Sequence, residues 1–143
     1  MLIGIPSIVS PELLKVLAEM GHGDEIVLAD GNFPAASHAQ RLIRCDGHGV
    51  PALLDAVLQL IPLDAYVDKP AALMQVVPGD PVETPIWSQY AQITAKRTGL
   101  ADPFEQVDRF AFYERAKQAY AIVATSESAL YANLILKKGV VTT

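Results

Sequence analysis

Short apolar segments that alternate with helix-like segments constrain the fold of this chain more than any other feature. Residues 25–29, 72–77 and 120–125 are short, continuous and apolar, which is typical of strands covered on both faces. Further strands are predicted at residues 41–45, 104–108 and 133–138, and helices at residues 11–20, 51–61, 85–98 and 109–119. This alternation predicts an α/β fold: a single three-layer α/β/α domain over residues 1–143, with helices on both faces of a mixed central sheet.

The composition restricts the partners that such a domain can have. The 143 residues are 51% hydrophobic and 19% charged, and their mean hydropathy is +0.26. Because a small domain has a large surface, this apolar excess favours a homo-oligomer whose subunit contacts cover part of it. The net charge of −5 argues against nucleic acid as a partner, since no basic surface is available for phosphates.

Cysteine usage and hydropathy together predict a cytoplasmic protein. Cys45 is the only cysteine, which excludes an intramolecular disulfide and suits a reducing compartment. Residues 1–9 are apolar but lack a basic region, and Pro6 interrupts them, so we expect no signal peptide. No apolar run approaches the roughly 18 residues that a membrane-spanning helix needs, so we expect no membrane partner.

His22 lies between two glycines, directly after the first predicted helix. Ser10 and Pro11 favour the start of this helix, and Gly21 is expected to end it in a left-handed conformation. An imidazole has an ordinary pKa of about 6.5, so His22 can give or take a proton near neutral pH. The local sequence leaves a second interpretation open, in which His22 is a polar helix cap that bonds a carbonyl group.

Asp30 directly follows the strand predicted at residues 25–29. In open α/β sheets, ligands bind outside the carboxyl ends of the strands, which is where this carboxylate is expected. It can accept hydrogen bonds from sugar hydroxyls or orient a nearby imidazole. The alternative is an Asx turn that opens the following loop.

Arg109, Tyr131 and Asn133 are further candidates for ligand contacts. Arg109 opens a predicted helix, where a cation opposes the helix dipole, so reaching a ligand is a fair alternative to a purely structural role. Tyr131 and Asn133 supply hydrogen-bond donors, acceptors and an aromatic face, which together suit a sugar. A turn followed by a core aromatic residue is the other interpretation of the segment 131–133.

Other kinds of site find little support in the sequence. Candidate metal ligands show no helical spacing and no zinc pattern; they are His22, Asp24, Asp30, His38, Cys45, Asp46 and His48. The serines lack a nucleophile motif, and Cys45 has no evident base. The Gly-His-Gly run at 21–23 lacks a third glycine and precedes a strand, unlike a phosphate-binding loop. We therefore expect neither a metal nor another cofactor.

Four stretches make the chain similar to a known family. They are residues 8–25 with the run Met-Gly-His-Gly-Asp, Asp30 with residues 32–35, residues 109–116 with the run Arg-Phe-Ala-Phe-Tyr-Glu-Arg, and residues 131–139. Over nearly its full length the chain resembles the L-fucose mutarotase and D-ribose pyranase family, and it is most similar to the bacterial L-fucose mutarotases.

The resemblance implies an isomerase that interconverts sugar anomers without a cofactor. It also implies assembly into rings, often decamers, with the pocket at a subunit boundary. His22 would correspond to the catalytic acid, and the sugar contacts would correspond to Asp30, Arg109, Tyr131, Ala132 and Asn133.

The substrate is expected to be L-fucose, because ribose-type members tend to carry His at the position of Arg109. Some fucose-type members carry extra histidines in the loop after Asp30, where this chain has Asn32 and Ala36, with His38 nearby. A D-ribose pyranase that interconverts pyranose and furanose forms is the nearest alternative. A non-catalytic sugar-binding protein is the second.

A mutarotase must open a hemiacetal, which requires one acid and one base. Positioned acid and base groups typically accelerate such a step by about 10² to 10⁴-fold. We assign His22 as the acid that protonates the ring oxygen. Asp30, Tyr131 or an ordered water remains as the candidate base, and Arg109 and Asn133 would hold hydroxyl groups.

Overall fold

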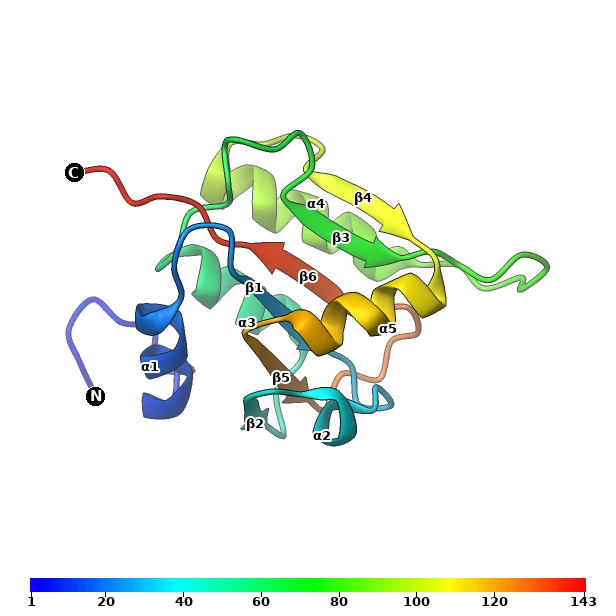
Figure 1. The fold of residues 1–143 in the computed structure, drawn as a ribbon, viewed down its shortest axis with the longest axis horizontal. Helices are drawn as coiled ribbons and strands as arrows, with labels where there is room; N and C mark the ends of the chain where they lie inside the picture. The colour runs from blue at the N-terminus through cyan, green and yellow to red at the C-terminus, as the bar shows by residue number, and fades with distance from the viewer.

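A six-stranded mixed sheet forms the centre of the protein, as a computed structural model of all 143 residues shows (Figure 1). The strand order is β2-β5-β1-β6-β3-β4. The pairs β2–β5, β5–β1 and β3–β4 are parallel, whereas β6 is antiparallel to both β1 and β3. The strands are β1 (Glu25–Ala29), β2 (Leu42–Cys45), β3 (Ala71–Met74), β4 (Phe104–Val107), β5 (Ala121–Thr125) and β6 (Leu134–Lys137). The predicted α/β fold with a mixed sheet is therefore confirmed.

Five helices cover the two faces of this sheet. They are α1 (Pro11–Glu19), α2 (Ala35–His38), α3 (Val50–Leu58), α4 (Pro85–Thr98) and α5 (Arg109–Gln118). One core cluster joins the sheet to α1, α3 and α4 through residues such as Leu13, Leu54 and Tyr90. A second cluster on the other face contains Phe112 of α5 and Ala35 of α2. Two cores on opposite faces of one sheet give the predicted three layers.

All strands except β6 run in the same direction, so their five carboxyl ends lie at one edge of the sheet. Leu28 of β1 pairs with both Val123 of parallel β5 and Leu134 of antiparallel β6. The ends of β1 and β5 therefore lie beside the start of β6, and β3 and β4 end at the same edge. We call this the carboxyl edge, and the opposite edge, where β1 begins and β6 ends, the amino edge.

Most predicted elements lie within a few residues of their expected bounds, and two local predictions were wrong. Gly21 does not adopt the left-handed conformation; that residue is Gly23, with φ +85°, in a turn where the Gly21 amide donates to Asp24 Oδ2 at 2.7 Å. The strand expected at residues 72–77 ends at Met74; after a last bond from the Gln75 amide to the Val107 carbonyl, the Val77 amide donates to the Tyr131 hydroxyl at 3.2 Å.

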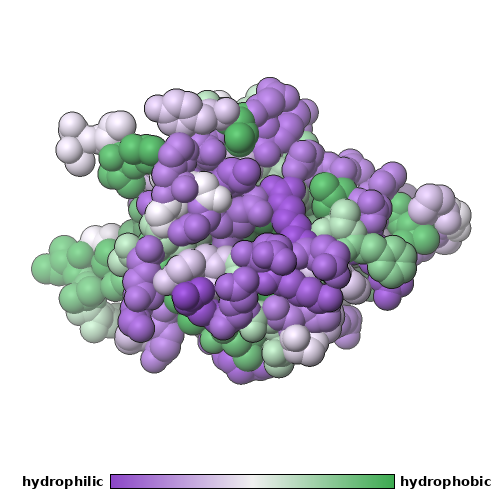
Figure 2. All heavy atoms as spheres, viewed as in Figure 1, coloured by the Kyte–Doolittle hydropathy of each residue, from purple (hydrophilic) through white to green (hydrophobic).

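Apolar side chains gather at both ends of the face that α5 covers, whereas the middle of that face is hydrophilic (Figure 2). Residues 1–3 are exposed near one end, and Phe110 and Val77 near the other. No helix combines the length and the apolar character that crossing a membrane requires.

Candidate active site

A cavity of about 270 Å³ opens at the carboxyl edge of the sheet. Four of the residues expected to contact a sugar line it, namely Asp30, Arg109, Tyr131 and Asn133. They come from the end of β1, the start of α5 and the segment before β6, so the strand register brings them together. Ala132, also expected at the sugar, is fully buried, and its carbonyl oxygen accepts a hydrogen bond from the Tyr90 hydroxyl at 2.6 Å.

Asp30 lines this cavity, and hydrogen bonds to a side chain and to the backbone hold it in place. Its amide donates to Asn133 Oδ1 at 2.8 Å, and its own Oδ1 accepts from the Asn32 amide at 2.9 Å. The second contact is the Asx turn considered above, so the turn and a place in the cavity occur together. Asp30 is only 8% exposed, and this burial raises the pKa of its carboxyl group although the hydrogen bonds oppose the shift. A carboxylate with a raised pKa is a stronger base.

Tyr131 forms a wall of the cavity and is fixed at several points. It is the only residue other than glycine with positive φ, at +54°. Its carbonyl oxygen accepts from Trp87 Nε1 at 2.8 Å, and its hydroxyl donates to Asp80 Oδ2 at 2.7 Å. The hydrogen bond to Asp80 raises the pKa of the Tyr131 phenol, so the phenol holds its proton more tightly.

Arg109 lies at the first position of α5, after the N-cap Asp108, whose side chain accepts from the Ala111 amide at 3.0 Å. Its guanidinium lies over the rings of Tyr113 and Phe110, at 5.5 and 5.9 Å from their centroids. Arg109 forms no salt bridge within the chain, unlike Arg44, Arg97 and Arg115. Its hydrogen-bond donors therefore remain available at the cavity for a ligand.

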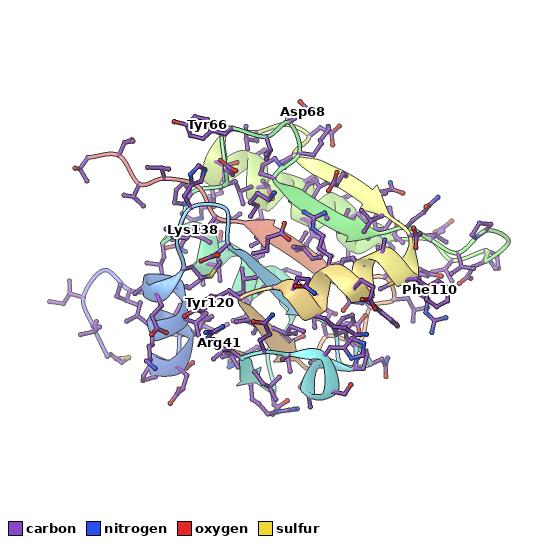
Figure 3. The ribbon with its side chains drawn as sticks, viewed as in Figure 1. Arg41, Tyr66, Asp68, Phe110, Tyr120 and Lys138 are labelled. Atoms are coloured by element: carbon purple, nitrogen blue, oxygen red, sulfur yellow. The ribbon has the colours of Figure 1, made fainter.

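His22 lies at the amino edge, away from the cavity. Its Nε2 is 2.9 Å from Asp64 Oδ1, and its ring centroid is 5.2 Å from that of Tyr66. In Figure 3, Tyr66 lies at the top of the view, left of centre, and Phe110, the neighbour of Arg109, lies well apart from it towards the right. The five residues of β1 separate His22 from Asp30 by roughly 16 Å at about 3.3 Å per residue. His22 and Asp30 of one chain therefore do not contact the same small ligand.

The Asp64 carboxylate is well placed to hold the His22 ring. The Asp64 side chain is 5% exposed, whereas that of His22 is 46% exposed. The Tyr66 amide donates to Asp64 Oδ1 at 3.0 Å, and this bond together with His22 lowers the pKa of the Asp64 carboxyl group. An ionised Asp64 fixes the orientation of the imidazole ring through this contact. His22 is thus bonded to a carboxylate and not, as the helix-cap interpretation had it, to a carbonyl group.

Known proteins similar to this chain share both its sequence and its fold. The fucose mutarotase of Homo sapiens is 57% identical over 143 residues, which cover 96% of this chain and 92% of the relative. The crystal structure of FucU from Bifidobacterium longum is 58% identical with a TM-score of 0.95, covering 97% of this chain and 99% of that one. The crystal structure of the fucose mutarotase from Streptococcus pneumoniae in complex with L-fucose is 55% identical with a TM-score of 0.94, covering 99% and 100%.

The sequence profile of the RbsD / FucU transport protein family matches residues 3–141. The chain belongs to the RbsD/FucU family. The family resemblance seen in the sequence is confirmed over nearly the whole chain.

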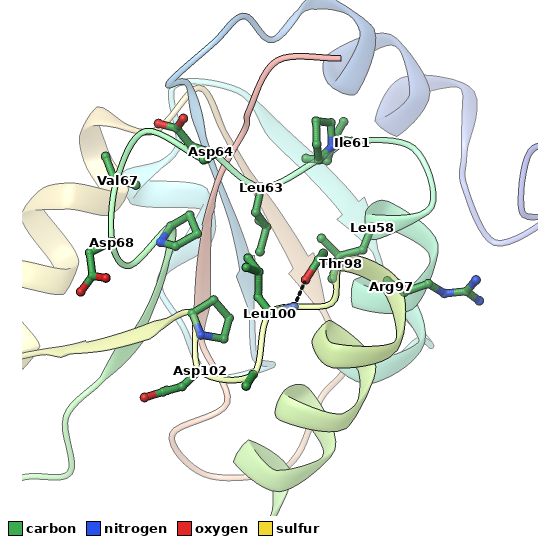
Figure 4. A pocket seen from close by; sticks show the side chains of 15 residues that line it. Leu58, Ile61, Leu63, Asp64, Val67, Asp68, Arg97, Thr98, Leu100 and Asp102 are labelled. Atoms are coloured by element: carbon green, nitrogen blue, oxygen red, sulfur yellow. Dashed lines mark hydrogen bonds between the residues drawn. The ribbon is translucent and has the colours of Figure 1, made fainter. Parts of the chain in front are cut away.

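A second, larger cavity of this RbsD/FucU protein, of about 590 Å³, contains none of the expected sugar contacts. Leu63 and Leu100 point into it, while the charged ends of Arg97 and Asp102 point away (Figure 4). These charges are already paired, Arg97 with Asp55 at 2.7 Å and Asp102 with Lys69 at 3.0 Å. The cavity at the carboxyl edge is smaller, but it offers the unpaired polar groups that recognition of a polyol requires.

Asp64, Tyr66 and Asp80 are polar neighbours of the candidate residues that the sequence did not reveal. Asp64 and Tyr66 lie in the segment before β3, and Asp80 lies in the loop after it. Each contacts a partner more than 40 positions away in sequence, so no local motif marks these residues. No three His, Cys, Asp or Glu side chains are arranged so that they could hold a metal ion.

Proposed function

We propose that this protein is a fucose mutarotase that interconverts the α and β anomers of L-fucose without a cofactor. The observation that carries the proposal is the convergence of an Asp30 carboxylate, an unpaired Arg109 guanidinium and the Tyr131 ring on one cavity. These groups match a polyol, which offers several hydroxyls and one apolar face. The similarity to a fucose mutarotase with L-fucose bound supports this sugar over others.

The reaction moves two protons and breaks one bond in the sugar. A base removes the proton of the anomeric hydroxyl, an acid protonates the ring oxygen, and the bond between the anomeric carbon and the ring oxygen breaks. The free aldehyde turns about one bond. The ring oxygen then attacks the other face of the carbonyl and returns its proton, while the base returns its own. No electron transfer or external reagent is needed, so positioned acid and base groups are sufficient.

Asp30 is the better of the two side-chain candidates for the base. Burial raises the pKa of its carboxyl group, and its side chain lines the cavity, where a sugar hydroxyl would lie. The Tyr131 hydroxyl instead donates its proton to a hydrogen bond with Asp80. Because this bond raises the pKa of the phenol, Tyr131 stays protonated and is a poor proton acceptor. Arg109 and the Asn133 amide group hold other hydroxyls of the sugar.

His22 acts as the acid, and in this proposal it reaches the cavity of a second copy of the chain. Its Nε2 is bonded to Asp64, so Nδ1 is the atom that faces the ring oxygen. Within one chain the length of β1 keeps His22 away from Asp30. Placing the amino edge of one copy against the carboxyl edge of another brings the acid and the base to the same sugar.

Exposed apolar side chains at both edges support this head-to-tail contact. Phe110 is 74% exposed near the cavity and Tyr66 is 80% exposed beside His22. Contacts between two different surfaces of identical chains close into rings when the rotation permits. The proposed assembly is therefore a homo-oligomeric ring, with one shared site at each contact, in the cytoplasm.

Saturation-transfer NMR on the anomeric protons of L-fucose, with D-ribose in parallel, tests the proposed reaction. We expect faster exchange between α- and β-fucose than in buffer. Exchange restricted to the ring forms of ribose would instead show a D-ribose pyranase. Chemical-shift changes on adding sugar, without exchange, would show a sugar-binding protein and contradict the proposal.

A further inference from the structure

The loop between β3 and α4 contains a tight turn beside the cavity. Val77, Pro78, Gly79 and Asp80 form this turn: the Asp80 amide donates to the Val77 carbonyl at 3.0 Å, and Gly79 has φ +89°. Pro at the second position and a left-handed Gly at the third are the preferences of a type II β-turn, so the sequence itself favours this conformation. In Figure 1 the loop extends from the end of β3, beyond the body of the sheet.

The first and last residues of this turn hold the Tyr131 hydroxyl from two sides. The Val77 amide donates to the hydroxyl oxygen at 3.2 Å, and the hydroxyl donates to Asp80 Oδ2 at 2.7 Å. The phenol therefore has its proton and one lone pair occupied within the chain. Both Val77 and Asp80 also line the cavity, so the turn is part of the cavity wall.

The backbone of Tyr131 adds a second reason why this contact is more than an incidental surface bond. Residues with a side chain seldom adopt positive φ, and those that do are held by their surroundings and cluster at functional sites. Trp87 holds the carbonyl group of Tyr131 from α4, while the turn holds the far end of its side chain. Tyr131 is therefore fixed both at its backbone and at its hydroxyl, which holds its ring in place along the cavity.

We infer that Asp80 is a positioning residue of the sugar site, which acts by holding the Tyr131 ring in place as a wall of the cavity. This inference rests on the proposed function, because it assigns Asp80 to the same site. A ring that is fixed before the sugar arrives loses less conformational freedom on binding, so the contact improves affinity. Because Tyr131 transfers no proton in this scheme, losing Asp80 should raise KM far more than it lowers kcat.

Four variants test the contact. Asp80→Ala should raise KM for L-fucose about 10-fold, as expected for loss of a hydrogen bond to a charged group. Asp80→Asn, which keeps an acceptor oxygen, should restore most of the affinity. Tyr131→Phe and the double variant Asp80→Ala with Tyr131→Phe should each resemble Asp80→Ala, because all three lack the same bond. Glu83→Ala removes an exposed carboxylate of the same loop and serves as the matched control, with unchanged kinetics.

The phenol pKa gives a readout that needs no substrate. In protein carrying tyrosine labelled at the phenolic carbon, the Tyr131 signal is identified by its loss in Tyr131→Phe and is followed with pH. Its pKa should fall in Asp80→Ala and stay unchanged in Glu83→Ala, since the bond to Asp80 stabilises the protonated phenol. An unchanged phenol pKa, an unchanged KM, or additive effects in the double variant would each overturn the inference. A lowered phenol pKa in a protein that does not exchange L-fucose would uphold the contact and refute the mutarotase instead.

Discussion

The proposed sharing of each site between two copies makes a quantitative prediction for mixed rings. His22→Ala removes the acid, and Asp30→Asn removes the base and changes a side chain that is only 8% exposed. If the two are co-expressed in equal amounts, a site is complete only where the cavity comes from the His22→Ala chain and the histidine from the Asp30→Asn chain. Each condition holds for half of the chains, so random mixing of head-to-tail rings restores about one quarter of wild-type activity.

A reciprocal mixture separates shared sites from sites within one chain. Wild-type chains mixed equally with chains that carry both substitutions should also show about one quarter of full activity if the sites are shared, and about one half if they are not. The assay is α-to-β exchange of L-fucose by saturation-transfer NMR, with each variant measured alone and gel filtration verifying equal assembly. No recovery in the first mixture, together with one half in the second, would refute the shared site.

Asp30→Asn and Arg115→Ala test the roles of buried charge, and Arg44→Ala is the exposed control. Because burial raises the pKa of Asp30 above its ordinary value of about 3.9, the folded protein binds the proton more tightly than the unfolded chain. The contribution of Asp30 to the free energy of unfolding should therefore fall as pH rises from about 3.9 through the raised pKa, so in urea titrations the wild-type free energy should fall relative to that of Asp30→Asn, while sugar binding by this variant weakens about 10-fold. Arg115 donates to Glu25 at 2.6 Å and also pairs with Glu105. Arg115→Ala should lower the free energy of unfolding by about 3 kcal/mol, since Glu25 is largely buried. Arg44→Ala, which breaks an exposed pair with Asp46, should leave it unchanged; equal effects of the two arginine variants would contradict this reasoning.

The sequence predicted those features that depend on local patterns. The Ser10 cap and the apolar run of β1 act over a few residues, and each occurs as expected. Local patterns singled out Asp30, Arg109 and Asn133 one by one as ligand contacts, whereas their place in one sugar site was an implication of the family resemblance; the structure places all three around one cavity. The same reasoning missed the short helix α2, whose four residues are too few for a periodic pattern.

Features that depend on strand order could not be read from the sequence. The bond between His22 and Asp64 joins residues 42 positions apart, and it exists because β6 lies antiparallel between β1 and β3. Asp80 contacts Tyr131 across 51 positions for a related reason. His22 and Asp30, in contrast, lie at opposite edges because the extended strand β1 runs between them. The candidate acid and base, and the strand between them, were thus predictable from the sequence, whereas their contacts with Asp64 and Asn133 required the fold.

Exchange between α- and β-L-fucose in the wild-type protein and in His22→Ala is the most direct test of acid–base mutarotation. We expect wild-type protein to accelerate exchange, and His22→Ala to lose about 10² to 10⁴-fold of that acceleration while circular dichroism and gel filtration stay unchanged. The 46% exposure of the His22 side chain makes a folding defect on its removal improbable. Full exchange activity in a well-folded His22→Ala variant would contradict the account.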